Sequence, residues 1–550
     1  MPKLRSTAAA LALAALLGAA PAAEATNGLK LTSYGARTAG RAGVDYAFAD
    51  DGTGPATNPA GMGFTWGNRF DNTWSIVFPR VEWTNRFGTF ENAERIYVPV
   101  PAYSLGLVFD PAKDWEVGDV FDLGRWGLFD PEPVAPGEAP LEPIPGDPAT
   151  APGEAEAEPA APGELSDEEL YGSRLKVGFG VFPVAGGKIN MEDMWTGDPG
   201  SPTPFNSRPV DWETDALAIA IAPSFAYRLS KNLSVGLTVQ VLHAFLEVDG
   251  GIAQPASTLR SPFDGTTLAI RDEVWTITDV EDTRTGLEHN NGYWGLSARL
   301  GLMYRTPLFS FGFVYQEESW GTDYHGRVEV DASDQVANVS AVDPSLLTVF
   351  GIDPGLGFVS NYDLLIQGFK FPRQLGLGFA FRPADWLSLG IDYTFINWEL
   401  TNKTFKTRLT NGDNPNLDIM SGPTLRVRVP LDFKDQHVIA VGATLRVFEG
   451  EDLVPGVPSS ALLWRVGYNY GNNPVPGKTT LPQQPAIAEH HLATGFTFRW
   501  GPLLELTAAV EWALPTSVET GPRHKGDITL SESKQELELW FLHFGLGINF

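Results

Sequence analysis

The chain has 550 residues, a formal net charge of −28 and no cysteine, and it is rich in Gly, Phe and Trp. The acidic balance excludes a general nucleic-acid-binding protein, which needs a basic surface. Without cysteine there are no disulfides, no thiolate catalysis and no cysteine-based metal or haem site. We expect neither a cofactor nor a metal ion.

Residues 1–25 have the three parts of a secretory signal peptide: a basic start, an apolar run over residues 8–20 and the small-residue cleavage site Ala23-Glu24-Ala25. The apolar run is shorter than the ~20 residues that a membrane-spanning helix needs. We therefore expect residues 1–25 to be removed and the mature protein to lie outside the cytoplasm.

Residues 26–71 are rich in Gly, Ala and turn residues and follow neither the period of a helix nor that of a strand. The rest of the chain, by contrast, is a series of amphipathic segments. Irregular backbone at membrane depth is tolerated only where protein shields it from lipid. We predict that residues 26–71 form a hatch inside a barrel that is built from residues 72–550.

The amphipathic segments alternate at period two, which indicates strands. In residues 375–382, Leu or Phe on one face alternates with Gly, Ala or Arg on the other. The same pattern recurs in residues 233–241, 387–395, 464–470, 496–500 and 504–512. Alternation alone allows a soluble sandwich with its apolar face inside or a membrane barrel with that face outside.

The connections favour the barrel. Short ones at residues 228–232, 306–308, 383–385 and 501–502 contrast with long ones at residues 249–291, 331–366, 401–432, 472–489 and 515–535. Short turns at one end and long loops at the other are typical of bacterial outer-membrane barrels. We predict an all-β, transmembrane antiparallel barrel of about 14 strands, closed so that no strand edge faces lipid, with the hatch in its lumen.

An acidic segment interrupts this pattern. Residues 130–164 consist mainly of Pro, Ala, Glu and Gly without Lys or Arg, so they cannot bury a core. Strand parity places them between the second and third strands, on the periplasmic side. Two interpretations stay open: a solvated spacer, or a docking arm for a basic partner.

No catalytic constellation is evident, so we expect no enzyme activity. His490 and His491 are neighbours on a strand and point to opposite faces, so they cannot chelate one metal together. Glu505 and Glu511 are expected to face the lumen, but no nucleophile accompanies them and no G-x-S-x-G motif occurs.

Two features suit an apolar ligand. The first is the long loop over residues 331–366, with a short helix that begins at Asp343 and ends before Gly351. Its apolar side chains either receive a ligand or pack on other loops. The candidate ligand-binding residues in this loop are Leu346, Leu347, Val349, Phe350, Leu356 and Phe358.

The second feature is an irregularity in the third strand. Pro cannot donate to a sheet ladder and Gly-Gly weakens it, so a bulge or kink is expected there. Such a kink opens a lateral gap in the wall, unless the strand simply ends at this point. The residues concerned are Phe179, Phe182, Pro183, Gly186 and Gly187.

The chain resembles the FadL-type outer-membrane transporters of long-chain fatty acids and other hydrophobic compounds. The resemblance rests on residues 40–43, 49–51 and 58–60, which match the hatch signature of that family, and on strand motifs at residues 226–229, 294–304, 433–435 and 473–476. It covers most of the mature chain except about residues 110–171. It implies a fourteen-stranded barrel with a hatch whose gate residues here are Gly40, Arg41, Asn58, Pro59 and Ala60.

The resemblance also implies a kinked third strand that releases ligand sideways into the membrane. Where fatty-acid transporters carry a basic residue on the fifth strand, this chain has Phe245, and Lys403 or Lys406 matches a second basic residue. We therefore expect a monomer that takes up fatty acid or another hydrophobic compound passively and delivers it to outer-membrane lipid. A general porin for polar solutes and an outer-membrane lipid hydrolase are the alternatives.

Overall fold

The structure is a computed structural model that describes residues 30–49, 51–65, 67–93, 95–96, 103–112, 172–194, 209–254, 257–260, 267–270, 273–278, 292–331, 333, 351–401, 403–421, 424–450, 460–525 and 530–550. The predicted signal peptide, the acidic segment and the loop residues Leu346, Leu347, Val349 and Phe350 lie outside these ranges. Among the described residues, no helix is long and apolar enough to cross a membrane.

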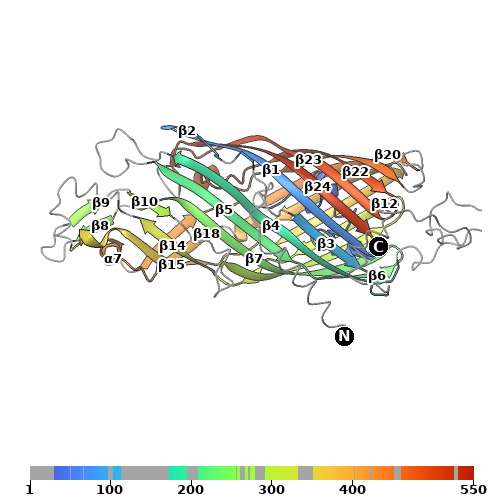
Figure 1. Ribbon diagram of the computed structural model, residues 1–550, viewed down its shortest axis with the longest axis horizontal. Helices are drawn as coiled ribbons and strands as arrows, with labels where there is room; N and C mark the ends of the chain where they lie inside the picture. The colour runs from blue at the N-terminus through green and yellow to red at the C-terminus, as the bar shows by residue number, and fades with distance from the viewer. Residues whose placement is uncertain are drawn as a thin grey trace, which may run out of the picture.

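The described strands form a closed antiparallel barrel of 14 strands, in agreement with the prediction (Figure 1). Its fourth strand is broken in two, β5 and β6. The barrel strands are β1 (Arg69–Asn85), β3 (Tyr103–Phe109), β4 (Leu175–Met194), β5 (Val210–Ile221), β6 (Ser224–Ser230), β7 (Leu233–Gln254), β11 (Tyr293–Arg305), β12 (Phe309–Gln316), β16 (Gln374–Ala384), β17 (Leu387–Ile396), β20 (Gln436–Glu449), β21 (Ala461–Gly471), β22 (His490–Trp500), β23 (Leu504–Glu519) and β24 (Lys534–Asn549).

Pairing of the first strand with the last closes the barrel. Strand β1 pairs with β24 from Arg69 opposite Asn549 to Thr84 opposite Lys534. Backbone donors and acceptors of the wall are thereby satisfied by neighbouring strands, which the hydrocarbon interior of a membrane requires.

The alternation predicted from the sequence holds along the wall. On β11, Trp294, Leu296 and Leu300 are exposed, whereas Ser297 and Arg299 between them are buried. Aromatic pairs such as Trp512 with Trp540, stacked at 4.9 Å between ring centroids, add to the outer surface. An apolar outside with aromatic residues is the surface that lipid requires.

The two ends of the barrel differ, as expected, but the long connections are not simple loops. Several of them fold into strands that pair above the barrel, at the left in Figure 1, and the C-terminus lies at the other end. These are β10 (Glu273–Thr278), β14 (Tyr324–Asp331), β15 (Val359–Gln367), β18 (Thr404–Thr410) and β19 (Thr424–Pro430). We name this group the upper sheet. The long connections predicted over residues 331–366 and 401–432 thus contain strands in their described parts, because backbone pairing continues beyond the membrane wall.

Smaller elements complete the described chain. They are α2 (Ala36–Ala39), η1 (Pro59–Phe64), β2 (Gly88–Glu91), β8 (Ser257–Arg260), β9 (Thr267–Ile270), β13 (Trp320–Gly321), η3 (Pro354–Leu356), α6 (Trp398–Thr401), α7 (Pro415–Ser421) and η4 (Gly477–Thr479). Only α2 and η1 lie in the described residues of the N-terminal segment, residues 30–65. Most side chains of that segment are buried, and they contact inward-facing residues of the wall.

The flanks of the acidic segment are tied together. Asp110, just after β3, pairs with Lys176 of β4 at 3.0 Å between Oδ2 and Nζ, and the backbone N–H of Ser173 donates to the same carboxyl. Burial alone would raise the pKa of the Asp110 carboxyl, but hydrogen bonds from Ser173 and Lys176 lower it to about 2. The chain thus leaves β3 and returns to β4 at a fixed point.

Candidate functional site

The N-terminal segment is fixed to the wall at Asn58. Its side chain caps η1 by accepting from the backbone N–H of Ala60 at 3.1 Å. The amide nitrogen donates to the carbonyl oxygens of Tyr46 (2.8 Å) and of Leu302 on β11 (3.3 Å). Asn58, Pro59 and Ala60 are all buried. The side chain therefore joins a turn of the segment, a second part of the segment and the barrel.

Inward-facing glycines allow the segment to lie directly on the wall. A Cβ at Gly312 of β12 would collide with the carbonyl oxygen of Tyr46, and one at Gly467 of β21 would collide with the backbone of Arg41. The other wall glycines that contact the segment are Gly106, Gly178, Gly236, Gly301, Gly376, Gly378, Gly390, Gly442 and Gly545. The small residues that alternate with the apolar ones along the strands therefore form the inner surface on which the segment lies.

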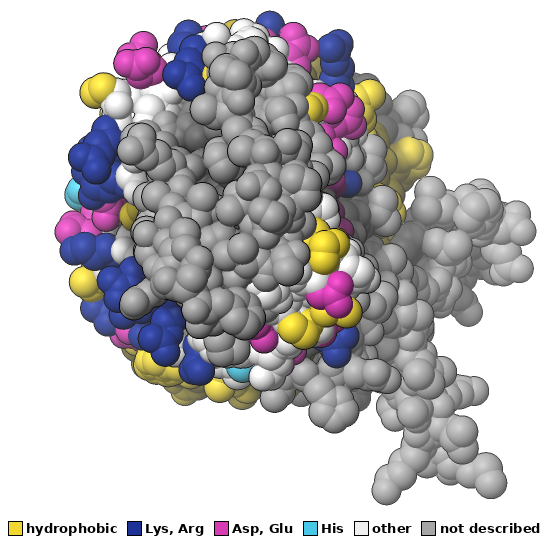
Figure 2. All heavy atoms as spheres, turned by 90° about the vertical axis from the view of Figure 1, so that its left-hand side faces the viewer, with side chains coloured by type: hydrophobic (Ala, Val, Ile, Leu, Met, Phe, Trp, Pro, Cys, Tyr) yellow, Lys and Arg dark blue, Asp and Glu magenta, His cyan; other side chains and the backbone are white. Residues whose placement is uncertain are grey.

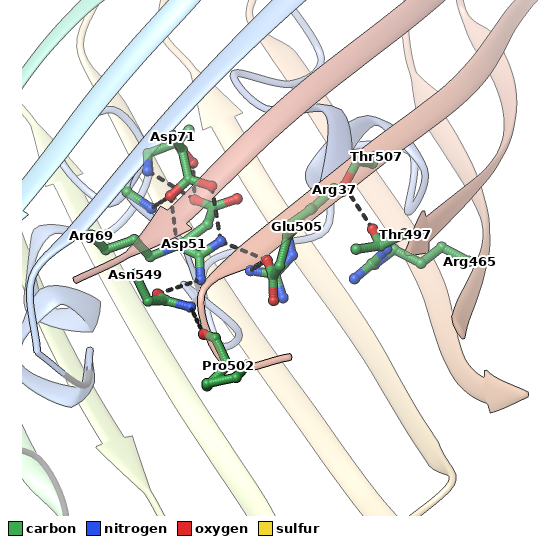
Figure 3. A network of polar contacts seen from close by, with 12 residues as sticks. Arg37, Asp51, Arg69, Asp71, Arg465, Thr497, Pro502, Glu505, Thr507 and Asn549 are labelled. Atoms are coloured by element: carbon green, nitrogen blue, oxygen red, sulfur yellow. Dashed lines mark hydrogen bonds and ion pairs between the residues drawn. The ribbon is translucent and has the colours of Figure 1, made fainter. Parts of the chain in front are cut away.

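A network of charged groups joins the segment to the strands that close the barrel (Figure 3). Arg69 of β1 donates to Asp71 (2.6 and 2.9 Å) and to Glu505 of β23 (2.8 Å). Arg37 of the segment lies 3.4 Å from the same Glu505, and Asp71 accepts from the backbone N–H of Gly52. Because these groups are buried, removing one partner would leave an uncompensated charge.

A second group of polar contacts holds residues 41–46. Arg41 donates to the carbonyl oxygen of Val44 and pairs with Asp45 at 3.0 Å. Asp392 of β17 accepts from the backbone N–H groups of Asp45 (2.6 Å) and Tyr46 (2.8 Å). Gly40 approaches Arg465 of β21, with 3.3 Å between the Cβ atoms if Gly40 carried one. The predicted gate residues therefore contact the wall in two separate places: Gly40 and Arg41 lie against β20 and β21, and Asn58–Ala60 lie against β7 and β11.

No partner of Glu511 was predicted from the sequence, and the structure shows three among the residues that it describes. Its carboxylate accepts from Thr32 of the segment at 2.7 Å, and Nδ1 of His491 lies 3.1 Å away. His543 of β24 approaches the other oxygen at 3.7 Å. His490 points the other way, to the hydroxyl of Tyr468, so the prediction that the two histidines face opposite sides is confirmed.

A polar cavity borders the segment on the opposite side. Lys30 donates to Gln374 of β16, and Arg299 of β11 donates to Gln316 through Nε and Nη2. The Nη1 atom of Arg299 is buried in this cavity and has no hydrogen-bond partner among the described residues. Alternation shows that Arg299 faces inward, but no motif identified it as a site residue.

Beyond the segment, toward the upper sheet, the interior becomes apolar. On β17, Ile396 lies nearer to the upper sheet than the inward-facing Asp392, and on β20, Val438 lies nearer to it than Ala440. Both Ile396 and Val438 belong to a buried apolar cluster. This cluster, here called the upper cluster, includes the predicted ligand residue Phe245. Its other aromatic members are Trp83, Trp212, Trp398, Phe433 and Phe541.

The remaining predicted ligand residues are not brought together with Phe245. Phe358 packs against a separate apolar cluster beneath the upper sheet, and Leu356 is 54% exposed. Lys403 and Lys406 are exposed, and Lys406 alternates with Phe405, which packs inward. The structure therefore does not place either lysine beside Phe245.

Strand β4 has the expected irregularity. Its register with β5 shifts between Pro183 and Ala185, yet the strand continues through Gly186 and Gly187 to Met194, so the alternative of a simple strand end was wrong. Phe182 is fully buried, and its ring contacts that of Tyr34 edge to face at 5.9 Å. Phe179, three residues earlier, is only partly buried and lies opposite Leu107 of β3.

A small cavity lies beside this irregularity. Pro183 lines it together with Thr32 and Tyr34 of the segment, Ser104 of β3 and Glu511. In the part of the chain that the structure describes, β3 pairs with β4 from Val177 to Val181, and β5 pairs with β4 on both sides of the irregularity. The segment, the bulge and a cavity thus meet at one point. No group of three or more His, Asp or Glu in the described part of the chain could hold a metal ion.

Comparison with known proteins gives a consistent result. The family model of outer membrane protein transport proteins (OMPP1/FadL/TodX) matches residues 202–536. Outer membrane protein P1 of Haemophilus influenzae is 25% identical over 177 residues, which cover 32% of this chain and 33% of that protein. The match thus spans about a third of the curated relative's length.

Solved structures resemble the whole fold. The toluene transporter TodX of Pseudomonas putida matches with a TM-score of 0.61 and 15% identity, over 96% of this chain and 100% of that one. The toluene transporter TbuX of Ralstonia pickettii gives 0.57 and 16%, over 94% and 99%. A FadL homologue of Pseudomonas aeruginosa gives 0.56 and 14%, over 97% and 100%. At such identities the likeness shows the fold alone.

Proposed function

Because the chain belongs to the OMPP1/FadL/TodX family of outer-membrane transport proteins, we propose that it takes up a small hydrophobic compound passively and releases it sideways into the membrane. The family transports hydrophobic compounds through the outer membrane. The observation that carries the finer proposal is the meeting of the N-terminal segment, the β4 bulge and a cavity at Pro183.

The upper cluster supports capture of an apolar ligand. Phe245 is buried there among other aromatic and aliphatic side chains. A basic residue in its place would instead favour a ligand with an acidic group. Each CH₂ group that a ligand buries contributes about 0.8 kcal/mol, so apolar contact alone can hold a long chain or an aromatic ring. Binding in this part needs no charged group.

The N-terminal segment would act as the hatch. It lies between the upper cluster and the short-turn end, and it is fixed at several points: Asn58 to β11, Arg37 to Glu505, and Thr32 to Glu511. Local movement of the segment between Thr32 and Gly40 would join the two cavities beside it, without release of the Asn58 anchor. The exit would then pass Phe182 and Pro183 into outer-membrane lipid.

The substrate class is tested by mass spectrometry of the compounds that co-purify with the full-length protein from outer membranes. We expect a bound hydrophobic compound. Binding is then compared for toluene and for a long-chain fatty acid, with the wild type and with Arg299→Gln. If a carboxylate is held in the polar cavity, Arg299→Gln weakens fatty-acid binding and leaves toluene binding unchanged. Absence of any apolar compound, together with no binding of either probe, contradicts the proposed function.

Movement of the hatch is tested with an engineered disulfide that can be reduced. Because the chain has no cysteine of its own, no other disulfide can form within it. In Gly40→Cys with Arg465→Cys, the Cβ separation of 3.3 Å is close to the ~3.5–4.5 Å of disulfides. We expect uptake to fall on oxidation and to recover on reduction. The two single-cysteine variants are the controls. Equal uptake in both redox states would show that this part of the segment need not move.

Lys403 and Lys406 provide a separate prediction. Because both side chains are exposed, replacing either lysine with Gln should leave uptake within about twofold of the wild type. Radiolabelled fatty-acid uptake measures this. Abolished uptake in both variants, with normal folding, would assign them to the ligand path.

A further inference from the structure

The outer face of the hairpin formed by β18 and β19 carries four cations in a compact array. Lys406 lies directly opposite Arg428, and Arg408 lies directly opposite Arg426. All four side chains are exposed. The opposite face of β18 carries Leu409, which is buried against the apolar cluster beneath the upper sheet. The cations therefore point away from the molecule.

This register is unfavourable without an anion. Residues directly opposite on antiparallel strands have Cβ atoms about 4.5–5.5 Å apart, and like charges there are destabilising. Among the described residues, none of the four side chains has an ion pair or a hydrogen bond. The nearest carboxylate of the neighbouring strand on this face, Asp363 of β15, lies opposite Thr410 and accepts from Asn411. Four neighbouring cations stand out in this chain, because its net charge is −28.

The position of the hairpin relates the array to the membrane. It rises from the upper ends of β17 and β20, two neighbouring strands of the barrel. Just below it, Tyr393, Phe395 and His437 form a contiguous group on the outer wall, with Tyr393 Oη 2.8 Å from His437 Nδ1 and the Phe395 ring 5.3 Å from the imidazole. Aromatic groups of this kind mark the interface between lipid and water.

Viewed from the end that carries the upper sheet, Lys and Arg side chains gather along one side of the rim (Figure 2). The hairpin array belongs to this end of the molecule, above the aromatic group. Cations just above an interfacial aromatic group would lie at the level of the lipid headgroups, which in the outer leaflet of a bacterial outer membrane belong to a phosphorylated glycolipid. Arg guanidinium groups bind phosphate oxygens in a bidentate manner, and Lys adds a point charge.

We propose that Lys406, Arg408, Arg426 and Arg428 form a docking surface for the phosphate groups of outer-leaflet lipopolysaccharide. A phosphate between each opposed pair would accept hydrogen bonds from both strands and remove the repulsion. The lipid would thereby hold the β18–β19 hairpin against the membrane surface. The proposal is independent of the compound that the barrel transports.

The test compares the wild type with a variant in which all four cations are replaced by Gln. Lipopolysaccharide retained by protein purified from outer membranes is quantified, and binding of purified lipopolysaccharide is measured in detergent. Since each basic residue at an anionic lipid surface contributes about 1 kcal/mol, we expect at least about tenfold weaker binding. Dephosphorylated lipopolysaccharide should bind the wild type as weakly as the intact lipid binds the variant.

The matched control removes four exposed cations that already have carboxylate partners: Arg80, Arg95, Lys370 and Arg373, paired with Glu82, Glu91, Glu318 and Glu317. It has the same net charge as the test variant and should bind as the wild type does. Equal loss in both variants would show a general charge effect and overturn the proposal. Equal binding of dephosphorylated lipid would also overturn it, as would full competition by millimolar inorganic phosphate, which would indicate a free-anion site. Heat-dependent gel mobility confirms that both variants fold.

Discussion

At the scale of single residues, the inward-facing glycines define where the N-terminal segment lies. Their role is close approach: at Gly312 and Gly467 the space that a side chain would occupy is filled by backbone of the segment. A wall lined with larger residues would hold the segment away from the strands and break contacts such as those of Asp392 with Asp45 and Tyr46.

We predict that Gly312→Val displaces the segment but leaves the barrel folded, because the barrel ladder does not depend on the segment. The expected results are retained heat-dependent gel mobility, faster proteolysis within residues 30–65 and higher ion conductance. Phe313→Val, a neighbouring change on the lipid-facing side, is the control and should leave the segment protected. Unchanged proteolysis of Gly312→Val would show that the wall can accommodate a side chain there.

Asp110 gives a prediction about pH. Its folded-state pKa of about 2 is below the ordinary value of about 3.9, so the Asp110–Lys176 pair stabilises the protein above that ordinary value and loses its effect as the pH falls toward 2. Asp110→Asn leaves Lys176 buried without its partner, which costs about 3–5 kcal/mol at pH 7. The difference in thermal unfolding between variant and wild type should shrink between pH 4 and pH 2. A difference that is constant with pH contradicts the ion pair.

At the scale of elements, the irregularity of β4 is important because of its neighbours. The bulge between Pro183 and Ala185 lies beside the segment, since Phe182 packs on Tyr34, and beside a cavity that contains Glu511. This coincidence is the structural argument for a lateral exit.

Regularising β4 should therefore reduce uptake. In Pro183→Ala with Gly186→Val and Gly187→Val, the strand regains a donor and loses its two most permissive positions, so the wall should stiffen. We expect at least about a tenfold decrease in the rate of uptake, an effect of about 1.4 kcal/mol, with binding to the upper cluster preserved. Equal uptake, with a variant shown to fold, would exclude exit at this point.

At the scale of the whole molecule, the closed barrel separates an apolar outside from a largely filled inside. The N-terminal segment occupies the lower interior, and the upper cluster occupies the part beneath the upper sheet. A general porin for polar solutes needs an open, charged constriction, which this packing does not favour. The alternative of a lipid hydrolase is addressed directly by an esterase assay on the purified protein.

Deletion of residues 30–65 should convert the closed barrel into an open one. The strands pair with one another throughout, so we expect the deletion variant to insert and keep its heat-dependent mobility, while single-channel conductance rises from a low wild-type value. A variant that fails to assemble would show instead that the segment is needed to build the barrel. High conductance of the intact protein would favour the porin.

The sequence by itself determined the barrel, because period-two alternation and short turns alternating with long loops are local signals. A membrane requires an apolar outer face and a fully paired backbone, and a closed barrel is the arrangement of such strands that meets both requirements. It also located the β4 irregularity, since Pro183 and Gly186-Gly187 act on their own strand. Only the tertiary structure decided the partners: Glu505 with Arg37 and Arg69, Glu511 with Thr32 and His491, and Lys406 opposite Arg428. These contacts join residues that are far apart in the chain or depend on strand register, and neither is encoded by any local pattern.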